Sequence, residues 1–256
     1  MTLPFPKTAL ITGGAKRLGL YMAKRFAREG WSLALHANSS TDEGQAAVEE
    51  LKRLGAKEAH LVIGDFMNEE DVSATYDKAV AEIGPLGVLI NNASTFEYDD
   101  VETASKESWE LHLLVNTRAP FVLSQKVALQ RKPACIINML DQRIFNWNHH
   151  FATYSIAKGA LWTMTQTMAI SLAPLKIRVN GIGPGPTLPS PRQDWDSFKV
   201  QQRYTMLDRL VDPEEVAETA HFLVHNQSVT GQMIAVDGGQ HLNWAPPKDA
   251  DLRLEE

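Results

Sequence analysis

The chain has 256 residues, of which 44% are hydrophobic and 22% charged, and its formal net charge is −6. This length allows one α/β domain or two small ones, and the acidic balance gives no global electrostatic reason to expect nucleic acid or an anionic membrane as a partner. The single cysteine, Cys135, excludes an intramolecular disulfide and a thiolate metal cluster, and we expect it to be a buried small hydrophobe in a reducing, intracellular setting.

The N-terminal residues show no long apolar run behind a basic segment, so they do not resemble a signal peptide. No apolar stretch approaches the roughly 20 residues that cross a bilayer. We therefore expect a cytoplasmic protein with no membrane partner.

Short apolar runs alternate with longer amphipathic segments along the chain. Strands that are buried on both faces of a parallel sheet have this continuous apolar character. The expected strands contain the runs 9–11, 33–35, 61–63, 88–90, 136–137, 177–179 and 234–236. No linker, repeat or low-complexity stretch interrupts them, so we expect a single, doubly wound α/β domain over residues 1–256 with its core at about 7–243.

Helix and loop signals lie between these runs. Residues 18–29 place apolar side chains at helical spacing, and Asp212–Glu215 gives an N-cap, a proline at the first helical position and acidic residues in the first turn. The longest irregular stretch, 183–210, predicts a lid or substrate-binding loop, and we expect 145–150 to border the substrate pocket. The tail 245–256 either covers a neighbouring subunit's site or is mobile, and we favour mobility for its charged end.

A glycine-rich turn, Thr12–Gly19, leads from the first strand into the first helix. Glycine lets the backbone approach a pyrophosphate there, and the helix N-terminus offers free N–H groups. A plain tight turn is the alternative interpretation. A glycine is usual at the position of Arg17, whereas here Lys16 and Arg17 place two cations beside the turn, unless both simply face water.

The end of the second strand indicates which nicotinamide cofactor fits. An NAD-selective site places a carboxylate there for the ribose hydroxyls, but this stretch contains His36, Asn38 and Ser39, and no carboxylate precedes Asp42. We therefore expect NADP(H) as the cofactor. After the third strand, Asp65 either accepts a hydrogen bond from adenine or caps the next helix.

Tyr154 and Lys158 lie four residues apart, on one face of a predicted helix. A free phenol has a pKa of about 10, and a nearby ammonium lowers that pKa by stabilising the phenolate. Tyr154 is therefore the expected proton donor, with Lys158 as its electrostatic support. Such pairs also occur by chance on amphipathic helices, but the position of this pair after the strand that ends near Met139 favours catalysis.

Asparagines mark two further positions. The run Asn91–Ala93 follows the fourth strand, and its side chains are expected to bridge strands at the floor of the cofactor cleft. Asn116 stands in an otherwise apolar helical context, where a buried amide must be hydrogen-bonded. It either holds a water that leads to Lys158 or is a structural residue satisfied by backbone.

Together these motifs resemble those of the short-chain dehydrogenases/reductases. The matching segments, spread over roughly 7–243, are Thr12–Gly19, Asn91–Ala93, Asn116, Tyr154–Lys158, Pro184–Gly185 and Val236–Gly239. The resemblance implies a Rossmann-type domain with a mainly parallel, about seven-stranded sheet, a nicotinamide cofactor and a homotetramer. The expected cofactor-binding residues are Gly13, Lys16, Arg17, Leu18, His36, Asn38, Ser39, Asp65, Phe66, Asn92, Ala93, Ser94, Tyr154, Lys158, Pro184, Gly185 and Thr187.

One position departs from that family. A serine is usual at the end of the fifth strand, but Ile136–Asp141 contains none, and Asp141 stands where the serine is expected. A carboxylate suits a substrate with N–H groups or ring nitrogens better than a simple ketone. A local variation without bearing on the substrate is the alternative.

This departure, with its neighbours, resembles pteridine reductase, and dihydromonapterin reductase is similar in the same ways. The resemblance implies a pterin stacked between the nicotinamide and Phe96, close to Arg17 and Ser94, with Asp141 and Tyr154 assisting protonation of ring nitrogens. The expected catalytic residues are Asp141, Tyr154, Lys158 and Asn116, and no metal is expected.

These observations predict the NADPH-dependent reduction of a pterin-type substrate. One alternative is an NADPH-dependent reductase of another carbonyl or imine compound, in which Asp141 is a local variation. The alternative from a different class is a catalytically silent nucleotide-binding sensor, which has no need of both Tyr154 and Lys158.

Overall fold

Seven parallel strands form one sheet in a computed structural model that describes residues 3–190 and 193–243. The strand order is β3-β2-β1-β4-β5-β6-β7. The strands are β1 (Thr8–Ile11), β2 (Ser32–Ala37), β3 (Glu58–Ile63), β4 (Val88–Asn91), β5 (Ala134–Met139), β6 (Ile177–Pro184) and β7 (Met233–Val236). Each apolar run of the sequence lies within one of them, so the expected Rossmann-type fold is confirmed, with a sheet that is entirely rather than mainly parallel.

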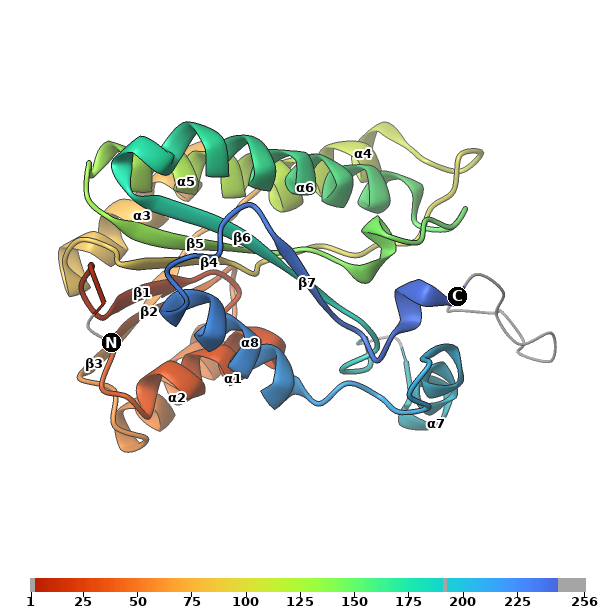
Figure 1. The fold of residues 1–256 in the computed structure, drawn as a ribbon, viewed down its shortest axis with the longest axis horizontal. Coiled ribbons are helices and arrows are strands. Elements are labelled where there is room, and N and C mark those ends of the chain that lie inside the picture. The colour runs from red at the N-terminus through yellow and green to blue at the C-terminus, as the bar shows by residue number, and fades with distance from the viewer. Residues whose placement is uncertain (1–2, 191–192, 244–256) are drawn as a thin grey trace.

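Helices cover both faces of the sheet (Figure 1). One layer consists of α1 (Arg17–Ala27), α2 (Thr41–Arg53) and α8 (Pro213–His225), and the other of α3 (Glu69–Ile83), α4 (Lys106–Leu113), α5 (Ala119–Leu129) and α6 (Ala152–Leu172). Neighbouring residues of one strand point to opposite faces, so Ile11 packs into the core under α1, α2 and α8, and Leu10 into the core under the other helices. Two apolar layers thus hold the sheet from either side.

Capping residues define where several helices begin. Asp212 is the N-cap of α8 and Pro213 its first residue, as predicted, and the structure adds a capping box between Asp212 and Glu215. The expected helix at 18–29 is α1. Asn68, whose side chain accepts a hydrogen bond from the Glu70 amide, caps α3, so the alternative that Asp65 caps this helix is wrong. The Asp65 carboxylate instead accepts from the Met67 amide within the preceding turn.

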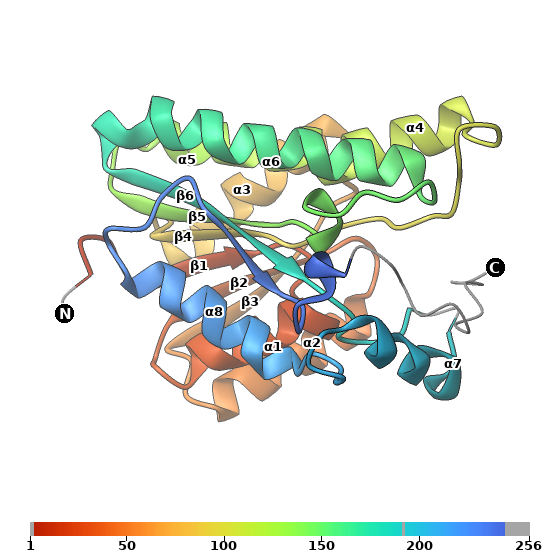
Figure 2. The ribbon, with the colours of Figure 1, turned by 45° about the vertical axis from the view of Figure 1, so that its right-hand side comes forward.

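The stretch 183–210 is more ordered than its composition predicts. β6 extends to Pro184, α7 occupies Trp195–Lys199, and a 3-10 turn covers Val200–Tyr204. Figure 2 shows α7 and this turn beyond the ends of β6 and β7. The predicted tail, 245–256, lies outside the described residues.

The order of the strands places a crevice at one edge of the sheet. The chain builds β1, β2 and β3 outward in one direction and then returns to place β4 on the other side of β1. In open parallel sheets, ligands bind beyond the carboxyl ends of the strands at such a reversal. Among the described residues, no helix is long and apolar enough to span a membrane.

Candidate active site

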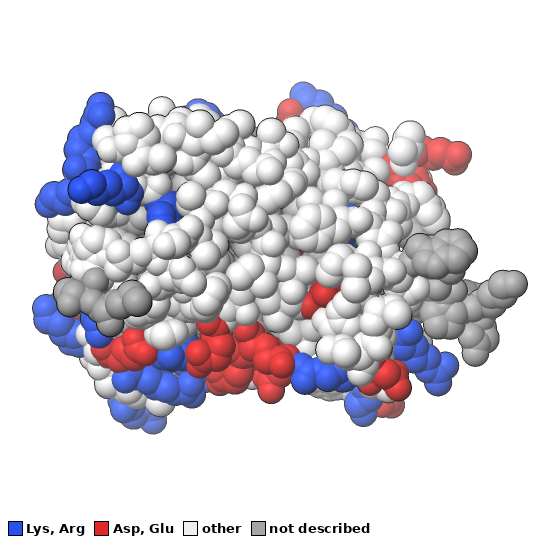
Figure 3. Space-filling model, viewed as in Figure 1, with Lys and Arg blue, Asp and Glu red and all other residues white. Residues whose placement is uncertain are grey.

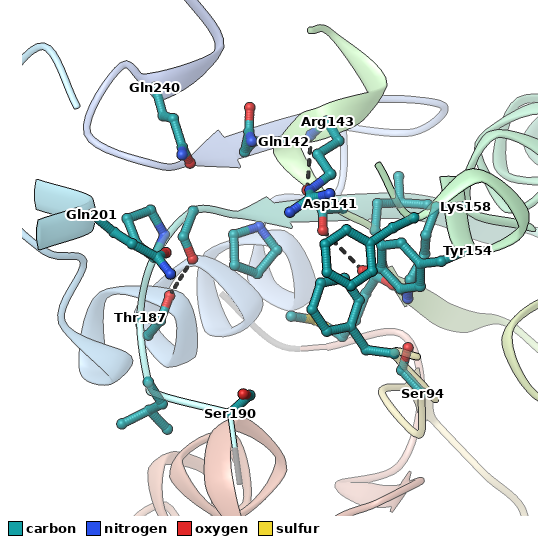
Figure 4. Close-up of a pocket in the computed structure, with 18 of the residues that line it drawn as sticks. Ser94, Asp141, Gln142, Arg143, Tyr154, Lys158, Thr187, Ser190, Gln201 and Gln240 are labelled. Carbon is teal, nitrogen blue, oxygen red and sulfur yellow. Dashed lines mark hydrogen bonds between the residues drawn. The ribbon is translucent and has the colours of Figure 1, made fainter. Parts of the chain in front are cut away.

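A cavity of about 680 Å³ opens beyond the carboxyl ends of β1, β4, β5 and β6 (Figure 4). Most of the residues singled out in the sequence line it: Gly13, Lys16, Arg17, Leu18, Asn92, Ala93, Ser94, Phe96, Asp141, Tyr154, Lys158, Pro184, Gly185 and Thr187. The remaining predicted site residues lie outside its lining: His36, Asn38, Ser39, Asp65, Phe66 and Asn116. The segment Asn146–His150 borders the cavity, as expected of that loop.

A set of hydrogen bonds fastens the glycine-rich turn to the end of β4. The Thr12 hydroxyl accepts from the backbone amides of Asn92 and Ala93, each at 2.9 Å. The Asn92 side chain donates to the carbonyls of Thr12 (2.8 Å) and Gly13 (3.1 Å). Gly13 has a φ of +59°, and a Cβ there would lie 3.1 Å from the Cα of Ala93. The turn is therefore held close to β4, with the N-terminus of α1 beside the cavity.

Arg17 has a φ of +53°, which explains why glycine is usual at its position. Its guanidinium donates to the carbonyls of Pro189 (2.5 Å) and Leu188 (3.3 Å). Burial lowers the pKa of this side chain from its ordinary value. Arg17 thus ties the start of α1 to the segment after β6, and the left-handed backbone costs about 1–2 kcal/mol.

The predicted contacts at the end of β2 divide into a buried and an exposed part. Gly13 donates its N–H to His36 Nδ1 (3.2 Å), so the other ring nitrogen carries the proton and donates to the Gly64 carbonyl (2.9 Å). The ring stacks on Phe66 at 3.9 Å, and burial lowers the pKa of His36 to about 4. His36, backed by Phe66, therefore supports the glycine-rich turn from its buried side.

Lys16 is the exposed part of this region. Its ammonium lies 3.4 Å from the hydroxyl of Ser40 and 3.7 Å from a carboxylate oxygen of Glu43, just beyond the end of β2. Asn38 and Ser39 precede this point on the chain, and both are exposed. A cation therefore stands where the sequence lacks the carboxylate typical of NAD-selective sites.

Asp141 and Tyr154 meet inside the cavity (Figure 4). The Tyr154 hydroxyl donates to Asp141 Oδ2 at 2.8 Å, and Asp141 Oδ1 accepts from the Arg143 amide at 2.8 Å. Burial, the Asp141 charge and this hydrogen bond raise the pKa of Tyr154 well above 10. The expectation that Lys158 lowers this pKa is therefore wrong here, because burial and the Asp141 carboxylate both raise it.

Lys158 lies one turn further along α6 and is 3% exposed. Its ammonium donates to the Met139 carbonyl at 2.8 Å and lies 5.6 Å from the centre of the Tyr154 ring. Burial lowers the pKa of Lys158 to about 8. The helix thus presents both predicted side chains to the cavity, and Lys158 is anchored to the end of β5.

An aromatic wall of Phe96, Phe151 and Tyr154 closes one side of the cavity. Phe96 stacks on Phe151 with ring centres 4.1 Å apart and meets the Tyr154 ring edge-on at 4.7 Å. The Arg143 guanidinium lies 4.7 Å from the centre of the Phe151 ring and 5.5 Å from that of Phe96. Arg143 Nη1 is buried and has no hydrogen-bond partner within residues 3–190 and 193–243. This wall therefore offers a flat apolar surface beside the Arg143 guanidinium, a hydrogen-bond donor.

Comparisons with known proteins agree with this geometry. A family profile described as enoyl-(acyl carrier protein) reductase matches residues 13–241. Cyclopentanol dehydrogenase from Comamonas testosteroni is 33% identical over 246 residues, covering 93% of this chain and 98% of that protein. The chain belongs to the short-chain dehydrogenase/reductase family. It is an oxidoreductase of that family, with the fold that the sequence predicts.

Solved structures of this family superpose closely on the chain. FolM alternative dihydrofolate reductase 1 from Brucella canis, complexed with NADP, is 37% identical with a TM-score of 0.87, covering 95% of this chain and 98% of that one. A short-chain dehydrogenase/reductase from Serratia marcescens is 26% identical with a TM-score of 0.86, covering 93% and 99%. The structural similarity therefore extends over nearly the whole fold.

Asn116 sits in a π-helical turn, Leu114–Arg118, between α4 and α5. Its side chain accepts from the Thr95 amide (2.8 Å) and donates to the Thr95 carbonyl (2.9 Å). Such turns are frequent at functional sites. Of the two interpretations of Asn116, the structure supports a structural residue satisfied by backbone, and its bonds hold Thr95 in the segment after β4 that carries Ser94 and Phe96.

No local sequence pattern predicts the buried network that fixes the start of α6. The backbone amide of Phe151 donates to the Asp99 carbonyl (2.7 Å), and the backbone amide of Thr153 donates to the Asp99 carboxylate (3.1 Å). The Thr153 hydroxyl also contacts this carboxylate and lies 2.7 Å from His112 Nδ1. Phe151 precedes the helix in a left-handed conformation, φ +57°, which its residue type does not predict. The network positions Tyr154 by fixing the first turn of its helix.

Proposed function

We propose that this chain is an NADPH-dependent reductase of a pterin-type substrate, such as a dihydropteridine or dihydromonapterin. The observation that carries the proposal is the hydrogen bond from Tyr154 to Asp141 Oδ2 inside the cavity. Where most of the family has a serine hydroxyl, this site has a carboxylate that accepts from N–H groups. A pterin offers such groups on its amino-pyrimidine ring.

The raised pKa of Tyr154 favours reduction over oxidation. A phenol whose pKa lies well above 10 is protonated at neutral pH and so holds the proton that a reduction needs. Oxidation of an alcohol needs the opposite state, a phenolate that accepts a proton. Tyr154 is therefore suited to giving a proton to a substrate atom that becomes basic.

The residues around the glycine-rich turn fit NADPH. The close approach of Gly13 to Ala93 and the N-terminus of α1 beside the cavity suit a pyrophosphate. Lys16, next to Ser40, suits a 2′-phosphate, and Lys158, which lines the cavity, suits a hydrogen bond to the nicotinamide ribose. The Brucella canis structure at 37% identity is complexed with NADP, which supports the same cofactor here.

The proton chemistry follows from the positions of Asp141 and Tyr154. When bound, NADPH supplies a hydride to the carbon of the substrate's C=N bond. The π electrons of that bond pass to the ring nitrogen, which takes the Tyr154 proton. Asp141 accepts from N–H donors of the heterocycle, Arg143 donates to an acceptor oxygen, and Phe96 contributes a stacking face.

A second candidate is a reductase of another carbonyl or imine compound. The 33% identity to a cyclopentanol dehydrogenase favours this alternative, because that protein's name describes oxidation of a secondary alcohol. In this case Asp141 does not select the substrate. The FolM structures, named as alternative dihydrofolate reductases, have the higher identity of 37% and favour the pterin.

A substrate panel tests the proposal. NADPH oxidation is followed at fixed enzyme concentration with dihydrobiopterin, dihydromonapterin, dihydrofolate, cyclopentanone and a cyclic imine. We expect kcat/KM for at least one pterin to exceed that for cyclopentanone by more than about 100-fold, the scale of one positioned acid or base. A higher value for cyclopentanone than for every pterin would overturn the pterin proposal in favour of the second candidate.

A further inference from the structure

Two histidines and a glutamate converge at the far end of the helices from the cavity. Arg17, at the start of α1, lines the cavity, and Glu29 follows the other end of that helix. His221 and His225 stand one turn apart near the end of α8. One oxygen of Glu29 and one nitrogen of each histidine all lie within 4.8 Å of one another.

We infer that Glu29, His221 and His225 bind a divalent transition-metal ion, for which Zn²⁺ is the best fit. Two imidazoles and one carboxylate form a common three-residue zinc site, completed by a water. This inference is independent of the proposed function, because the three residues lie outside the cavity lining. It also departs from the sequence, which predicted no metal.

The distances suit one ion between the three side chains. His221 Nε2 lies 2.9 Å from Glu29 Oε1, and His225 Nε2 lies 3.9 Å from Glu29 Oε2. Two tetrahedral ligands about 2.0–2.1 Å from zinc are roughly 3.3 Å apart. The two measured distances bracket that value but reach different oxygens of Glu29, and the three ligand atoms lie within 4.8 Å of one another, so side-chain rotation is needed to reach coordination geometry.

The protonation of His225 suits a ligand. Its Nδ1 lies 2.9 Å from the His221 carbonyl, and because a carbonyl only accepts, Nδ1 carries the proton. The lone pair therefore remains on Nε2, which is the atom that faces Glu29. A hydrogen bond from the second ring nitrogen to a backbone carbonyl is typical of metal-binding histidines.

His221 supplies a second observation. Its Nε2 is buried and makes no hydrogen bond within the described part of the chain, although a carboxylate oxygen lies 2.9 Å away. The centres of the two histidine rings are 4.0 Å apart. A neutral imidazole with an unused nitrogen is the form that binds a metal ion.

Neighbouring charges are compatible with a cation. Arg25 pairs with Glu29 at 2.8 Å and with Glu218 at 2.6 Å, so Glu218 still neutralises Arg25 when Glu29 turns to a metal. Figure 3 shows acidic side chains gathered over α8, and α8 carries Glu214, Glu215 and Glu218. Each of these carboxylates is paired with an arginine (Glu214 with Arg28, Glu215 with Arg209, Glu218 with Arg25), so they offset the positive charge near the site. Bound metal would join α1 to α8.

Zinc titration of the full chain tests the inference. After removal of metal with a chelator, we expect one Zn²⁺ per chain by isothermal titration calorimetry, a higher melting temperature with Zn²⁺, and tetrahedral absorption bands with Co²⁺. Mg²⁺ should produce none of these effects, because it prefers oxygen ligands. A dissociation constant for Zn²⁺ weaker than about 1 mM would overturn the site.

Variants separate this site from adventitious binding. His225→Ala and Glu29→Gln should each weaken zinc binding at least about tenfold, and neither should change NADPH oxidation. His60→Ala is the matched control, because His60 lies 3.1 Å from Glu82 and 3.7 Å from Glu58 on the surface of β3. Equal zinc affinity in His60→Ala and wild type is expected. Zinc binding that survives the double variant His221→Ala/His225→Ala would contradict the assignment.

Discussion

The Tyr154 hydroxyl lies 2.8 Å from Asp141 Oδ2 and donates to it, so the carboxylate and the phenol act as one unit. The pair joins the segment after β5 to the first turn of α6. In that arrangement burial and the nearby negative charge keep the phenol neutral, and the other carboxylate oxygen accepts from the Arg143 amide. Substitutions of Asp141 and of Tyr154 separate the contributions of the two partners.

Asp141→Ser restores the residue that is usual in the family. The substitution removes the carboxylate that is proposed to accept substrate N–H groups. It also removes the negative charge that helps to raise the pKa of Tyr154. We expect kcat/KM for the preferred pterin to fall about 100-fold, while kcat/KM for cyclopentanone stays constant or rises. NADPH oxidation with both substrates, measured side by side, gives this ratio.

Asp141→Asn is the control for charge, because it keeps the size of the side chain and one acceptor oxygen. Pterin turnover should fall with Asp141→Asn as well if the negative charge matters. A substrate ratio that stays at the wild-type value in both variants would mean that Asp141 does not select the substrate.

Tyr154→Phe removes the proton donor and leaves the ring in the aromatic wall. We expect kcat to fall by about 10² to 10⁴, with NADPH affinity maintained in a fluorescence titration. Tyr98→Phe is the control, because the Tyr98 hydroxyl bonds to His150 at 3.1 Å and has no proposed catalytic role. Turnover of Tyr154→Phe near the wild-type rate would refute the assigned role.

Local patterns in the sequence predict much of this site. Tyr154 and Lys158 stand four residues apart, which places them on one helix face whatever the tertiary structure is. The glycine-rich turn and the missing carboxylate after β2 are likewise local. The seven apolar runs predicted the strands because a sheet covered on both faces needs continuous apolar segments.

Long-range contacts could not be predicted in this way. The bond that raises the pKa of Tyr154 joins two segments, and the one from Arg17 to the Pro189 carbonyl spans 172 residues. The left-handed conformation of Phe151 is maintained by contacts around Asp99, far away in the chain. Only the folded chain shows that the phenol is buried and bonded to a carboxylate, and that both effects raise its pKa.

Lys16→Ala tests the proposed preference for NADPH. The ammonium stands beside Ser40 at the end of β2, where it can meet a 2′-phosphate. We expect the Kd for NADPH to rise about tenfold, the scale of one charge-assisted hydrogen bond, with the Kd for NADH unchanged. Lys24→Ala, which removes a cation from α1 and breaks its ion pair with Glu50 of α2, is the control. Equal weakening of both cofactors by Lys16→Ala would argue against a phosphate contact.

Arg17 allows its backbone and its side chain to be tested separately. Arg17→Gly relieves the left-handed conformation, whereas Arg17→Ala keeps it, and both lose the bonds to Leu188 and Pro189. We expect Arg17→Gly to be more stable than Arg17→Ala by about 1 kcal/mol in denaturant unfolding, and both to raise KM for the substrate to a similar extent. Equal stability of the two variants would show that this position is not strained.

Titration of Lys158 should set the alkaline limit of the enzyme's activity. Burial lowers its pKa to about 8, so the ammonium is present below pH 8 and is lost as the pH rises through that value. Because an unfolded lysine stays protonated to about pH 10.4, this group makes unfolding less favourable as the pH rises from about 8 to 10.4. Activity moves the other way: kcat/KM for NADPH, which reports the free enzyme, should fall above pH 8. Lys158→Arg stays charged, so its kcat/KM, although lower, should not fall above pH 8. A fall above pH 8 that persists in this variant would show that another group titrates.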